Sequence, residues 1–394
     1  MDARSSLSSK AHRMSRSSRR EFLQRALAGS TLPWVGGWAA QAGLLDDADL
    51  IVRSTRPLDA ETPVGAFDRF LTPNNQFFIR SHFGPPAVGL SPWRLEVEGL
   101  VNQPTSLSLD QLDGLENVTL PAVLQCSGNG RAFFQPTIAG VGWERGAVGN
   151  AEWSGPRLVD VLKRAGLQPE AAHVQLHGAD TPPNPKTPAF YRSIPLARAL
   201  DPSTILATRM NGEPLPLLHG GPIRLVVPAW AGNHWIKWLR KLRVAKDEAP
   251  GFYQQTGYKI PKVPTPPGVD LKPSDVTPVT TLNVKSLIAR PLEGAKLKPG
   301  RVEVRGVAWT GEGVVKSVEI QTTEGGAWLP AKLEGEPKPG TWVAWTYPWD
   351  ATLGRHAIRA RATDTLGQVQ PETSPWNKSG YLWNGIDRVA FEVA

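Results

Sequence analysis

Residues 302–309 read Val-Glu-Val-Arg-Gly-Val-Ala-Trp, a run of β-branched and apolar residues with charged residues between them. This pattern is typical of a β-strand that buries one face. Similar runs follow at 315–320, 341–345 and 356–362, and turn-forming residues separate them. Short strands at close spacing predict an all-β, immunoglobulin-like sandwich at the carboxyl end of the chain, and we expect it to form a two-fold dimer through its Trp-rich strands.

The chain between residues 68 and 243 has a mixed pattern. β-type runs occur at 93–98, 174–177 and 223–227, whereas residues 157–165 have apolar side chains at helical spacing. An α+β domain is therefore predicted here. After it come six prolines, which leave few backbone donors for a helix or a sheet and predict an extended linker: Pro261, Pro264, Pro266, Pro267, Pro273 and Pro278.

The amino terminus supplies most of the net charge of +8. Residues 1–42 contain seven Lys or Arg and two acidic residues, so the rest of the chain is near +3. Residues 18–23, Ser-Arg-Arg-Glu-Phe-Leu, match a twin-arginine export signal, and an apolar stretch and the small residues Ala40-Gln41-Ala42 follow. We therefore expect export to the periplasm by the twin-arginine pathway, with cleavage after Ala42.

These features give a predicted signal peptide at 1–42, an α+β domain at 43–258, and a linker with the β-sandwich at 259–394. No other stretch approaches the roughly 20 apolar residues of a membrane span, so no span is expected in the mature chain. Outside the leader no basic run with interleaved aromatic residues occurs, which argues against a nucleic-acid partner.

Cys126 is the only cysteine of the chain. A single cysteine cannot form an internal disulfide, and a free thiol in an oxidising compartment is a liability unless it is buried or bound. Its thiolate could be a soft metal ligand, or a nucleophile assisted by His82 or His219 with Asn129. A buried structural thiol is the third interpretation of these residues alone.

Residues 126–131, Cys-Ser-Gly-Asn-Gly-Arg, resemble the Cys-Ala-Gly-Asn-x-Arg loop of the sulfite oxidase family, whose cysteine binds molybdenum held by a molybdopterin dithiolene. Four other segments resemble family motifs in the family's order: 78–82, 193–196 with 210–216, 219–224 and 235–239. The resemblance runs from about Phe67 to the carboxyl terminus. It implies a molybdopterin-binding α+β domain, a dimerisation domain, and oxidation of sulfite to sulfate.

The resemblance also implies which residues hold the cofactor, with Cys126 as the metal ligand. A soft thiolate suits a metal that already carries two dithiolene sulfurs, and an anionic cofactor needs cations and donors around it. The implied cofactor-binding residues are Phe78, Ile79, Arg80, Ser81, His82, Asp180, His219, Arg224, Trp235, Ile236 and Lys237.

For the reaction itself, the resemblance implies Arg80, Arg131, Trp143 and Tyr258. Sulfite is an anion, so the two arginines would attract it, while the tryptophan would form a wall of the pocket. The tyrosine hydroxyl would hydrogen-bond the substrate. Animal sulfite oxidases have a further arginine in an Asn-Leu-Arg-Gly segment, where this chain has Ser379, and that difference puts the substrate in doubt.

Electrons are expected to leave to an external acceptor such as cytochrome c, because the sequence contains no pair of His in a haem-binding setting and no Cys-x-x-Cys-His. Two other functions remain open at this stage. One is a molybdopterin-dependent reductase of methionine sulfoxide, and the other is a non-enzymatic periplasmic binding protein built on the sandwich.

Overall fold

The computed structural model describes residues 50–86 and 92–394. These described residues belong to one compact unit. The predicted twin-arginine signal at 1–42 lies outside the described residues, so its prediction stays open.

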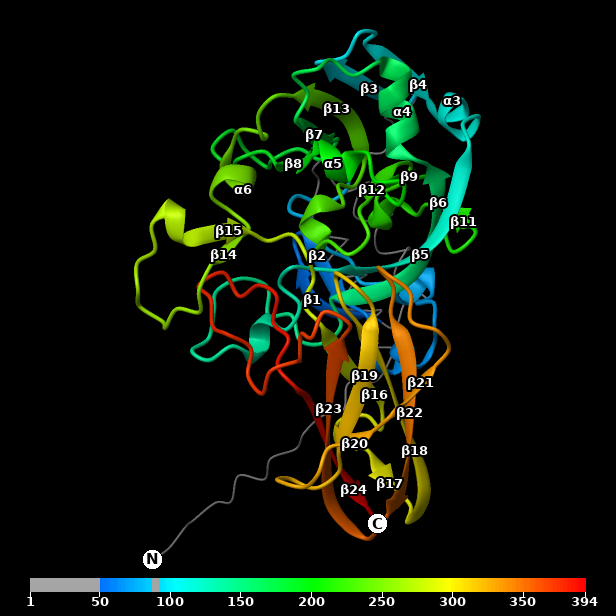
Figure 1. The fold of residues 1–394 in the computed structure, drawn as a ribbon, viewed down its shortest axis with the longest axis vertical. Coiled ribbons are helices and arrows are strands. Elements are labelled where there is room, and N and C mark those ends of the chain that lie inside the picture. Colours follow the sequence, from blue (N-terminus) through cyan, green and yellow to red (C-terminus); the bar gives the residue numbers. More distant parts are fainter. Residues whose placement is uncertain (1–49, 87–91) are drawn as a thin grey trace, which may run out of the picture. The chain divides into compact units, whose positions relative to one another are not determined.

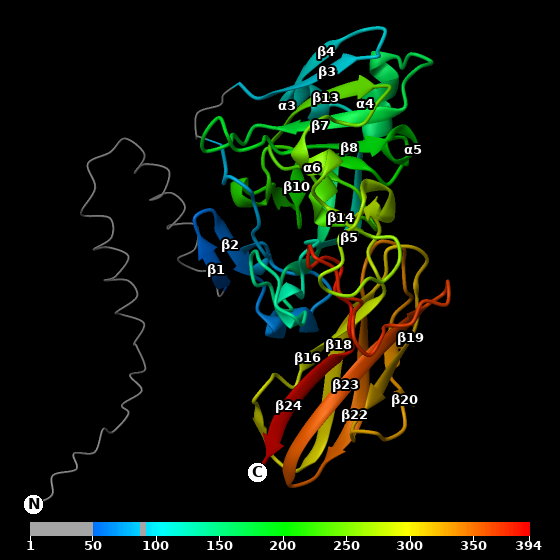
Figure 2. The same cartoon turned by 90° about the vertical axis from the view of Figure 1, so that its left-hand side faces the viewer.

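The amino-terminal half contains a five-stranded sheet with the order β4-β3-β13-β7-β8, whose strands lie side by side in Figure 2. β13 pairs in parallel with β3 and antiparallel with β7. The predicted strands at 93–98 and 174–177 are confirmed within it. The bounds are β3 Arg94–Gly99, β4 Thr105–Ser108, β7 His173–Gly178, β8 Tyr191–Pro195 and β13 Leu239–Ala245.

A second sheet of this half has the order β11-β10-β6-β5, and β9 and β12 form a separate pair. β5 and β6 pair along their whole length, from Asn117↔Pro156 to Gln125↔Val148. This long ladder fixes the point at which β5 ends, directly before Cys126. The bounds are β5 Asn117–Gln125, β6 Val148–Pro156, β9 Ile205–Ala207, β10 Arg209–Met210, β11 Glu213–Pro214 and β12 Arg224–Val226.

Helices contribute less than the α+β prediction implies, and this half is mostly β. The predicted helix at 157–165 is confirmed as α4, whose residues Leu158, Val161 and Leu162 are fully buried. No helix within the described residues is long and apolar enough to cross a membrane. The α-helices within residues 50–86 and 92–394 are α3 Leu109–Asp113, α4 Leu158–Ala165, α5 Leu196–Ala199 and α6 Phe252–Gln255.

The proline-rich segment differs from the extended linker that its prolines predict. Its two ends, β14 (Lys259–Pro261) and β15 (Val276–Pro278), pair with each other as antiparallel strands. Pairing is possible because Ile260 and Thr277, which face each other, keep their backbone N–H groups.

The carboxyl-terminal region consists of two sheets, with orders β16-β18-β22-β21 and β17-β24-β23-β19-β20 (Figure 1). Apolar residues of both sheets form one buried cluster, which confirms the predicted all-β character. The bounds are β16 Lys285–Arg290, β17 Lys296–Leu297, β18 Gly300–Trp309, β19 Val315–Gln321, β20 Leu329–Pro330, β21 Lys332–Glu334, β22 Val343–Ala351, β23 Gly354–Asp364 and β24 Asp387–Val393.

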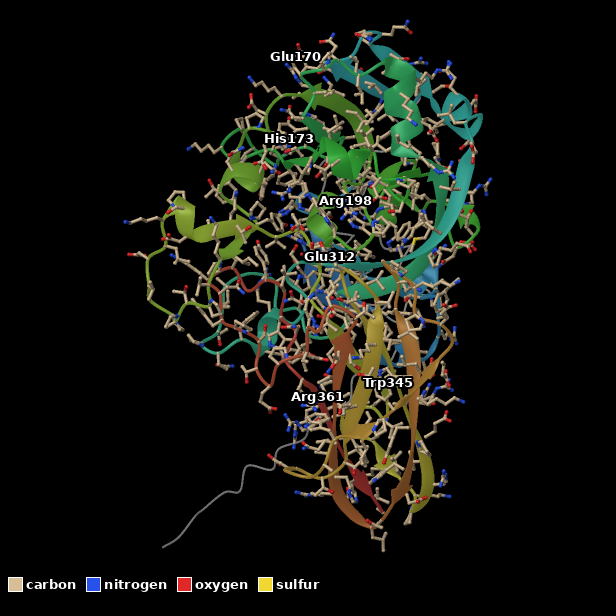
Figure 3. All side chains as sticks on the ribbon, in the orientation of Figure 1. Glu170, His173, Arg198, Glu312, Trp345 and Arg361 are labelled. Atoms are coloured by element: carbon tan, nitrogen blue, oxygen red, sulfur yellow. The ribbon has the colours of Figure 1, made fainter. Side chains whose placement is uncertain are left out.

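The prediction that the Trp-rich strands expose an apolar face for a dimer is wrong for three of their tryptophans, whereas the dimer itself stays a prediction. Trp309, Trp342 and Trp345 are at most 1% exposed, so they are covered within the chain itself. Trp345 lies among the carboxyl-terminal strands in Figure 3. The alternation of these strands identified buried positions but could not show which neighbour buries them.

Contacts between the carboxyl-terminal sheets and β5 hold the end of β5 in place. Trp309 and Trp342 share a buried cluster with Val123 of β5. The indole Nε1 of Trp309 donates to Oε1 of Gln125, 2.9 Å away, and both groups are buried. Gln125, the residue before Cys126, is thus held in place by the carboxyl-terminal sheets.

A further antiparallel pair is formed by β1 (Ile51–Thr55) and β2 (Leu58–Glu61), and β2 supplies Asp59 to the site.

Candidate functional site

Cys126 lies where two cavities meet. The inner cavity and its mouth enclose about 710 Å³, and the outer cavity with its opening encloses about 1020 Å³. Both are lined by Cys126, Arg80, His82 and Tyr258. The thiol follows the end of β5, and its backbone N–H donates to the carbonyl of Ala147 at 2.9 Å. Burial raises the pKa of the thiol, against the opposite effect of Arg80.

The inner cavity collects most of the predicted cofactor-binding residues from distant segments of the chain. Ten of the eleven line it: Phe78, Arg80, Ser81, His82, Asp180, His219, Arg224, Trp235, Ile236 and Lys237. The exception is Ile79, which is 3% exposed and exchanges two backbone hydrogen bonds with Ala60. Ile79 therefore supports its neighbours and does not line the cavity.

Three cations line the inner cavity: Arg80, Arg224 and Lys237. The side chains of Arg224 and Lys237 donate to backbone carbonyls and not to carboxylates. Arg224 donates to the carbonyls of His219 and Trp235, at 2.7 and 3.1 Å, while its buried Nε has no partner among the described residues. Lys237 donates to the carbonyl of Leu218 at 3.0 Å. Burial lowers the pKa of Arg224 to about 9 and that of Lys237 to about 7.

Two carboxyl groups accompany these cations. Asp59 is 1% exposed and forms an ion pair with Arg80, with Nη1 and Oδ2 3.1 Å apart. Burial raises the pKa of Asp180 to about 6, although Lys237 acts in the opposite direction. Asp59 is paired with Arg80 and Asp180 interacts with Lys237, so Arg224 keeps a buried charge without a carboxylate partner, which suits an anionic ligand.

The hydrogen bonds around His82 decide whether the hydroxyl of Tyr258 accepts a hydrogen bond from His82 or donates one to it. Nη2 of Arg80 lies 3.3 Å from Nδ1 of His82, and a guanidinium only donates, so Nδ1 is the acceptor. The imidazole proton is then on Nε2, which lies 2.8 Å from the hydroxyl oxygen of Tyr258 and donates to it. The hydroxyl proton of Tyr258 is therefore free to donate to a group in the cavity.

His82 is neutral at neutral pH in this arrangement. Burial lowers its pKa well below the ordinary value, and the charges of Arg80 and Lys237 act in the same direction. Burial also raises the pKa of Tyr258, so the phenol keeps its proton. Neutral His82 and protonated Tyr258 are the states that the hydrogen bonds require.

The outer cavity contains Arg131, Trp143 and Tyr258 from the predicted reaction residues, together with Arg80. Nη1 of Arg131 donates to the carbonyl of Val141 at 3.1 Å, and its guanidinium lies 5.4 Å from the ring of Tyr381. A Cβ at Gly128 would lie 2.6 Å from Nη2 of Arg131, so a larger residue there would shift the flexible end of this side chain from its present position.

Trp143 is 1% exposed and lines the outer cavity, as expected of a pocket wall. Ser379 also lines it, but its hydroxyl donates to the carbonyl of Lys259 at 3.1 Å. The neighbouring Lys378 places a cation in the lining instead. The carboxyl-terminal segment thus contributes to this cavity, although it is more than 240 residues from Cys126.

Several lining residues were missed by the sequence analysis. Ser127 and Asn233 are buried and hydrogen-bonded to each other at 2.9 Å, and their positions beside Cys126 and Trp235 could have suggested them. Trp238 also lines the inner cavity and lies within the motif at 235–239, although it was not named as a cofactor-binding residue. Four more have no sequence signal of their own, because tertiary contacts bring them to the cavities: Phe190, Tyr253, Lys378 and Tyr381.

Comparisons with known proteins agree with this geometry. Residues 82–253 match the family described as oxidoreductase molybdopterin binding domain, and residues 276–394 match the Mo-co oxidoreductase dimerisation domain. The chain is 38% identical over 364 residues to mitochondrial sulfite oxidase of Drosophila melanogaster, covering 86% of this chain and 62% of that protein. It is 32% identical over 374 residues to sulfite oxidase of Arabidopsis thaliana, covering 87% and 94%.

Among solved structures, the sulfane dehydrogenase SoxCD from Paracoccus pantotrophus is similar, with a TM-score of 0.74, 25% identity, and 93% of each chain covered. Sulfite oxidase of Gallus gallus is 37% identical over 354 residues, covering 84% of this chain and 76% of that protein. The chain spans less than two thirds of the fly and human proteins, at 62% and 66% of their lengths.

The residues present fit a molybdenum–molybdopterin cofactor. Arg224, a buried cation whose Nε has no hydrogen-bond partner, lines the inner cavity together with Lys237 and Arg80, and the thiol of Cys126 lies at the junction with the outer cavity. Within the described residues there is no cluster of three or more His, Cys, Asp or Glu that could hold a metal ion. The thiol of Cys126, which lines both cavities, is a soft donor of the kind that suits molybdenum. The chain belongs to the sulfite oxidase family of molybdopterin-dependent oxidoreductases.

Proposed function

We propose that this chain oxidises sulfite to sulfate and passes two electrons to an external acceptor such as a c-type cytochrome. The balanced half-reaction is SO₃²⁻ + H₂O → SO₄²⁻ + 2 H⁺ + 2 e⁻. The observation that carries the proposal is the convergence of Cys126, Arg80 and Tyr258 at the junction of the two cavities, with Arg131 in the lining of the outer one. Family membership supports the same reaction.

The outer cavity has the charge that an anionic substrate needs. Arg131 has no ion-pair partner in the described part of the chain, so its positive charge is available to an anion. Arg80 is held by Asp59, which fixes its guanidinium beside Cys126 and Tyr258. A preorganised pair of cations lowers the cost of orienting the substrate.

Tyr258 supplies a directed hydrogen-bond donor. His82 donates to its oxygen, and the hydroxyl proton then points to another acceptor. An oxygen atom of sulfite in the outer cavity is the acceptor that we assign to it. The same hydroxyl can hold a proton during the return of electrons, because burial raises its pKa.

The cofactor would be held by Cys126 and by the cations and donors of the inner cavity. When bound, it supplies the oxygen atom and accepts the electron pair. Arg224 and Lys237 would contact its anionic groups, and the unpartnered Nε of Arg224 would gain an acceptor. Trp235 and Ile236 would exclude water, because both are almost completely buried.

A stoichiometric assay tests the proposed reaction. Purified holoenzyme should convert one sulfite to one sulfate while it reduces two equivalents of oxidised cytochrome c or ferricyanide. The Cys126→Ser variant is the matched control and should show no turnover. Sulfite that stays unconsumed by molybdenum-loaded enzyme would contradict the proposal, and reduction of a methionine sulfoxide instead would favour a reductase.

The remaining expectations are proposals about the whole protein. We infer that the carboxyl-terminal region is an immunoglobulin-like sandwich and that the chain forms a homodimer, which the match to the dimerisation domain supports. Light scattering at micromolar concentration should give twice the mass of the mature chain, and a monomer would count against the dimer.

Periplasmic export by the twin-arginine pathway rests on Arg19 and Arg20 of the leader. Replacing both with lysine should leave cofactor-loaded precursor in the cytoplasm, as seen by cell fractionation. Normal delivery of this variant to the periplasm would show that another pathway is used.

A further inference from the structure

Arg192 is a completely buried arginine that no prediction included. It lies on β8, and its side chain is 0% exposed. Its Nη1 donates to the carbonyl of Tyr253, and its Nη2 lies 3.2 Å from Nε2 of His234. That Nε2 is also 3.0 Å from the carbonyl of Val279, to which it can donate only when it does not accept from Arg192.

The surroundings of Arg192 do not neutralise its charge. Over residues 50–86 and 92–394 no carboxylate lies within ion-pair distance of it, and its Nε has no hydrogen-bond partner. Burial lowers its pKa to about 10, so the guanidinium remains positively charged at neutral pH. A buried charge without an ion pair costs free energy, and such a group is kept only where something offsets that cost.

The aromatic ring of Tyr258 is the group that interacts with this charge. The guanidinium carbon of Arg192 lies 5.3 Å from the ring centroid, within the range of a cation–π interaction. The contact is desolvated on the arginine side, because Arg192 is fully buried, and the partly buried ring of Tyr258 packs against Tyr381 and Phe190. Such desolvated contacts are the stronger ones of their kind.

The conformation of Tyr258 needs this support. Its φ of 53° lies in the left-handed region, which is unfavourable for a residue with a bulky side chain. Its ring stacks on Tyr381 with centroids 5.1 Å apart and an interplanar angle of 5°. Its oxygen lies 2.8 Å from Nε2 of His82. The ring of Tyr258 is thus held by Tyr381, His82 and Arg192. Arg192 contributes a positive charge to this set and lines neither cavity.

We propose that Arg192 is a positioning residue for the reaction: its buried guanidinium holds the Tyr258 ring in place and stabilises negative charge that develops on the phenol oxygen when the hydroxyl donates to substrate. Arg192 does not line either cavity, so it acts through Tyr258 and not on the substrate directly. The proposal rests on the proposed oxidation of sulfite, in which Tyr258 is the donor.

A double-mutant cycle separates this role from a general structural one. Arg192→Gln removes the charge and keeps hydrogen-bonding groups, and Tyr258→Phe removes the hydroxyl and keeps the ring. We expect Arg192→Gln to lower kcat for sulfite roughly tenfold, equivalent to about 1.4 kcal/mol, with little change in KM. In the Tyr258→Phe background the same substitution should change kcat less than twofold. An equal fall in both backgrounds would overturn the proposal.

Two further variants guard against trivial outcomes. Arg192→Lys keeps a cation and should lose less activity than Arg192→Gln; an equal loss would contradict a role for the charge. Arg361→Gln is the matched control, because Arg361 has a cation–π contact with Trp328 at 4.2 Å and lies among the carboxyl-terminal strands (Figure 3). It should leave kcat unchanged, and molybdenum content and thermal midpoint are recorded for every variant.

A spectroscopic arm does not depend on turnover. In protein labelled with ¹³C-tyrosine, the five tyrosines give few signals, and that of Tyr258 is the one lost in Tyr258→Phe. Arg192→Gln should shift or broaden this signal while the others stay in place. If the enzyme does not oxidise sulfite but the signal shifts, the proposed function fails and the positioning contact stands. An unchanged Tyr258 signal refutes the contact itself.

Discussion

Replacing Arg131 with glutamine removes one unpaired positive charge from the outer cavity, which is also lined by Lys378. In the structure this guanidinium makes one hydrogen bond, to the carbonyl of Val141, and lies over Tyr381. Glutamine keeps a donor of similar reach for the carbonyl, so the loop should keep its shape. The charge available to an anionic substrate is lost.

The expected magnitude follows from that loss. A hydrogen bond to a charged group contributes roughly 1.5–3 kcal/mol, which corresponds to a fall of roughly ten- to a hundredfold in kcat/KM. The fall should appear mainly as a raised KM, because Arg131 attracts the anion, whereas Tyr258 and Arg80 remain in place. Arg80 cannot replace it fully, because Asp59 already neutralises that charge.

The assay is steady-state sulfite oxidation with a saturating acceptor at low and high ionic strength. Wild-type KM should rise with salt, and that dependence should be weaker in Arg131→Gln, since screening acts on the removed charge. Arg131→Lys keeps the charge and should recover part of the affinity. Arg301→Gln is a control on an exposed arginine of β18, with 69% of the side chain accessible, and should have no effect. Unchanged sulfite kinetics in Arg131→Gln would refute the assigned anion pocket.

Three other changes give separate checks. Cys126→Ser should abolish sulfite turnover while the thermal midpoint of the apo-protein stays within a few degrees, because oxygen is a poorer ligand than thiolate for this metal; turnover in the variant would remove the ligand assignment. Tyr258→Phe should lower kcat roughly ten- to a hundredfold with a small change in KM, since one charge-assisted donor is lost but the ring stays; a KM effect alone would argue against its role. Lys285→Met should stabilise the protein by about 1–3 kcal/mol at pH 6, because burial lowers the pKa of Lys285 to about 7 from an unfolded value of 10.5. The free-energy penalty for the buried charge is full below pH 7 and disappears as pH rises from 7 towards 10.5. The increase in the free energy of unfolding, measured by denaturant unfolding, should therefore be smaller at pH 9 than at pH 6. An increase independent of pH would contradict this cause.

Much of the strand order along the chain could be predicted from local pattern. The runs at 315–320 and 356–362 alternate because one face of each strand packs into a shared core. The run at 302–309 is buried on both faces in its second half, because Ala308 packs into that core and Val307 and Trp309 pack into the cluster that contains Val123 of β5. The helix at 157–165 could be found for the same reason, since Leu158 and Val161 recur on one face. These features depend on neighbours in sequence.

Features that depend on distant neighbours could not be predicted in this way. The pairing of β14 with β15 was not predicted, because the number of prolines in the linker does not show which of the remaining backbone N–H groups can pair. Alternation marked Trp309 and Trp342 as apolar positions, but their cover comes from β5 and nearby loops.

The candidate site shows the same division. The motifs around Cys126, Arg80 and Trp235 led to residues that do meet at the cavities. Ile79 was included because it lies within a motif, although its backbone pairs with Ala60 and it lines neither cavity. Asp59 was not found, because a single acidic residue on a short strand has no signature until Arg80 pairs with it.

Anaerobic titration of the molybdenum-loaded protein with sulfite tests the central claim most directly. Each molybdenum should be reduced by one equivalent of sulfite with formation of one sulfate, and partial reoxidation should give an electron paramagnetic resonance signal of molybdenum(V). Cys126→Ser protein should give neither the stoichiometric reduction nor the wild-type signal. Molybdenum-loaded wild-type protein that remains oxidised in excess sulfite would contradict the claim that this site oxidises sulfite.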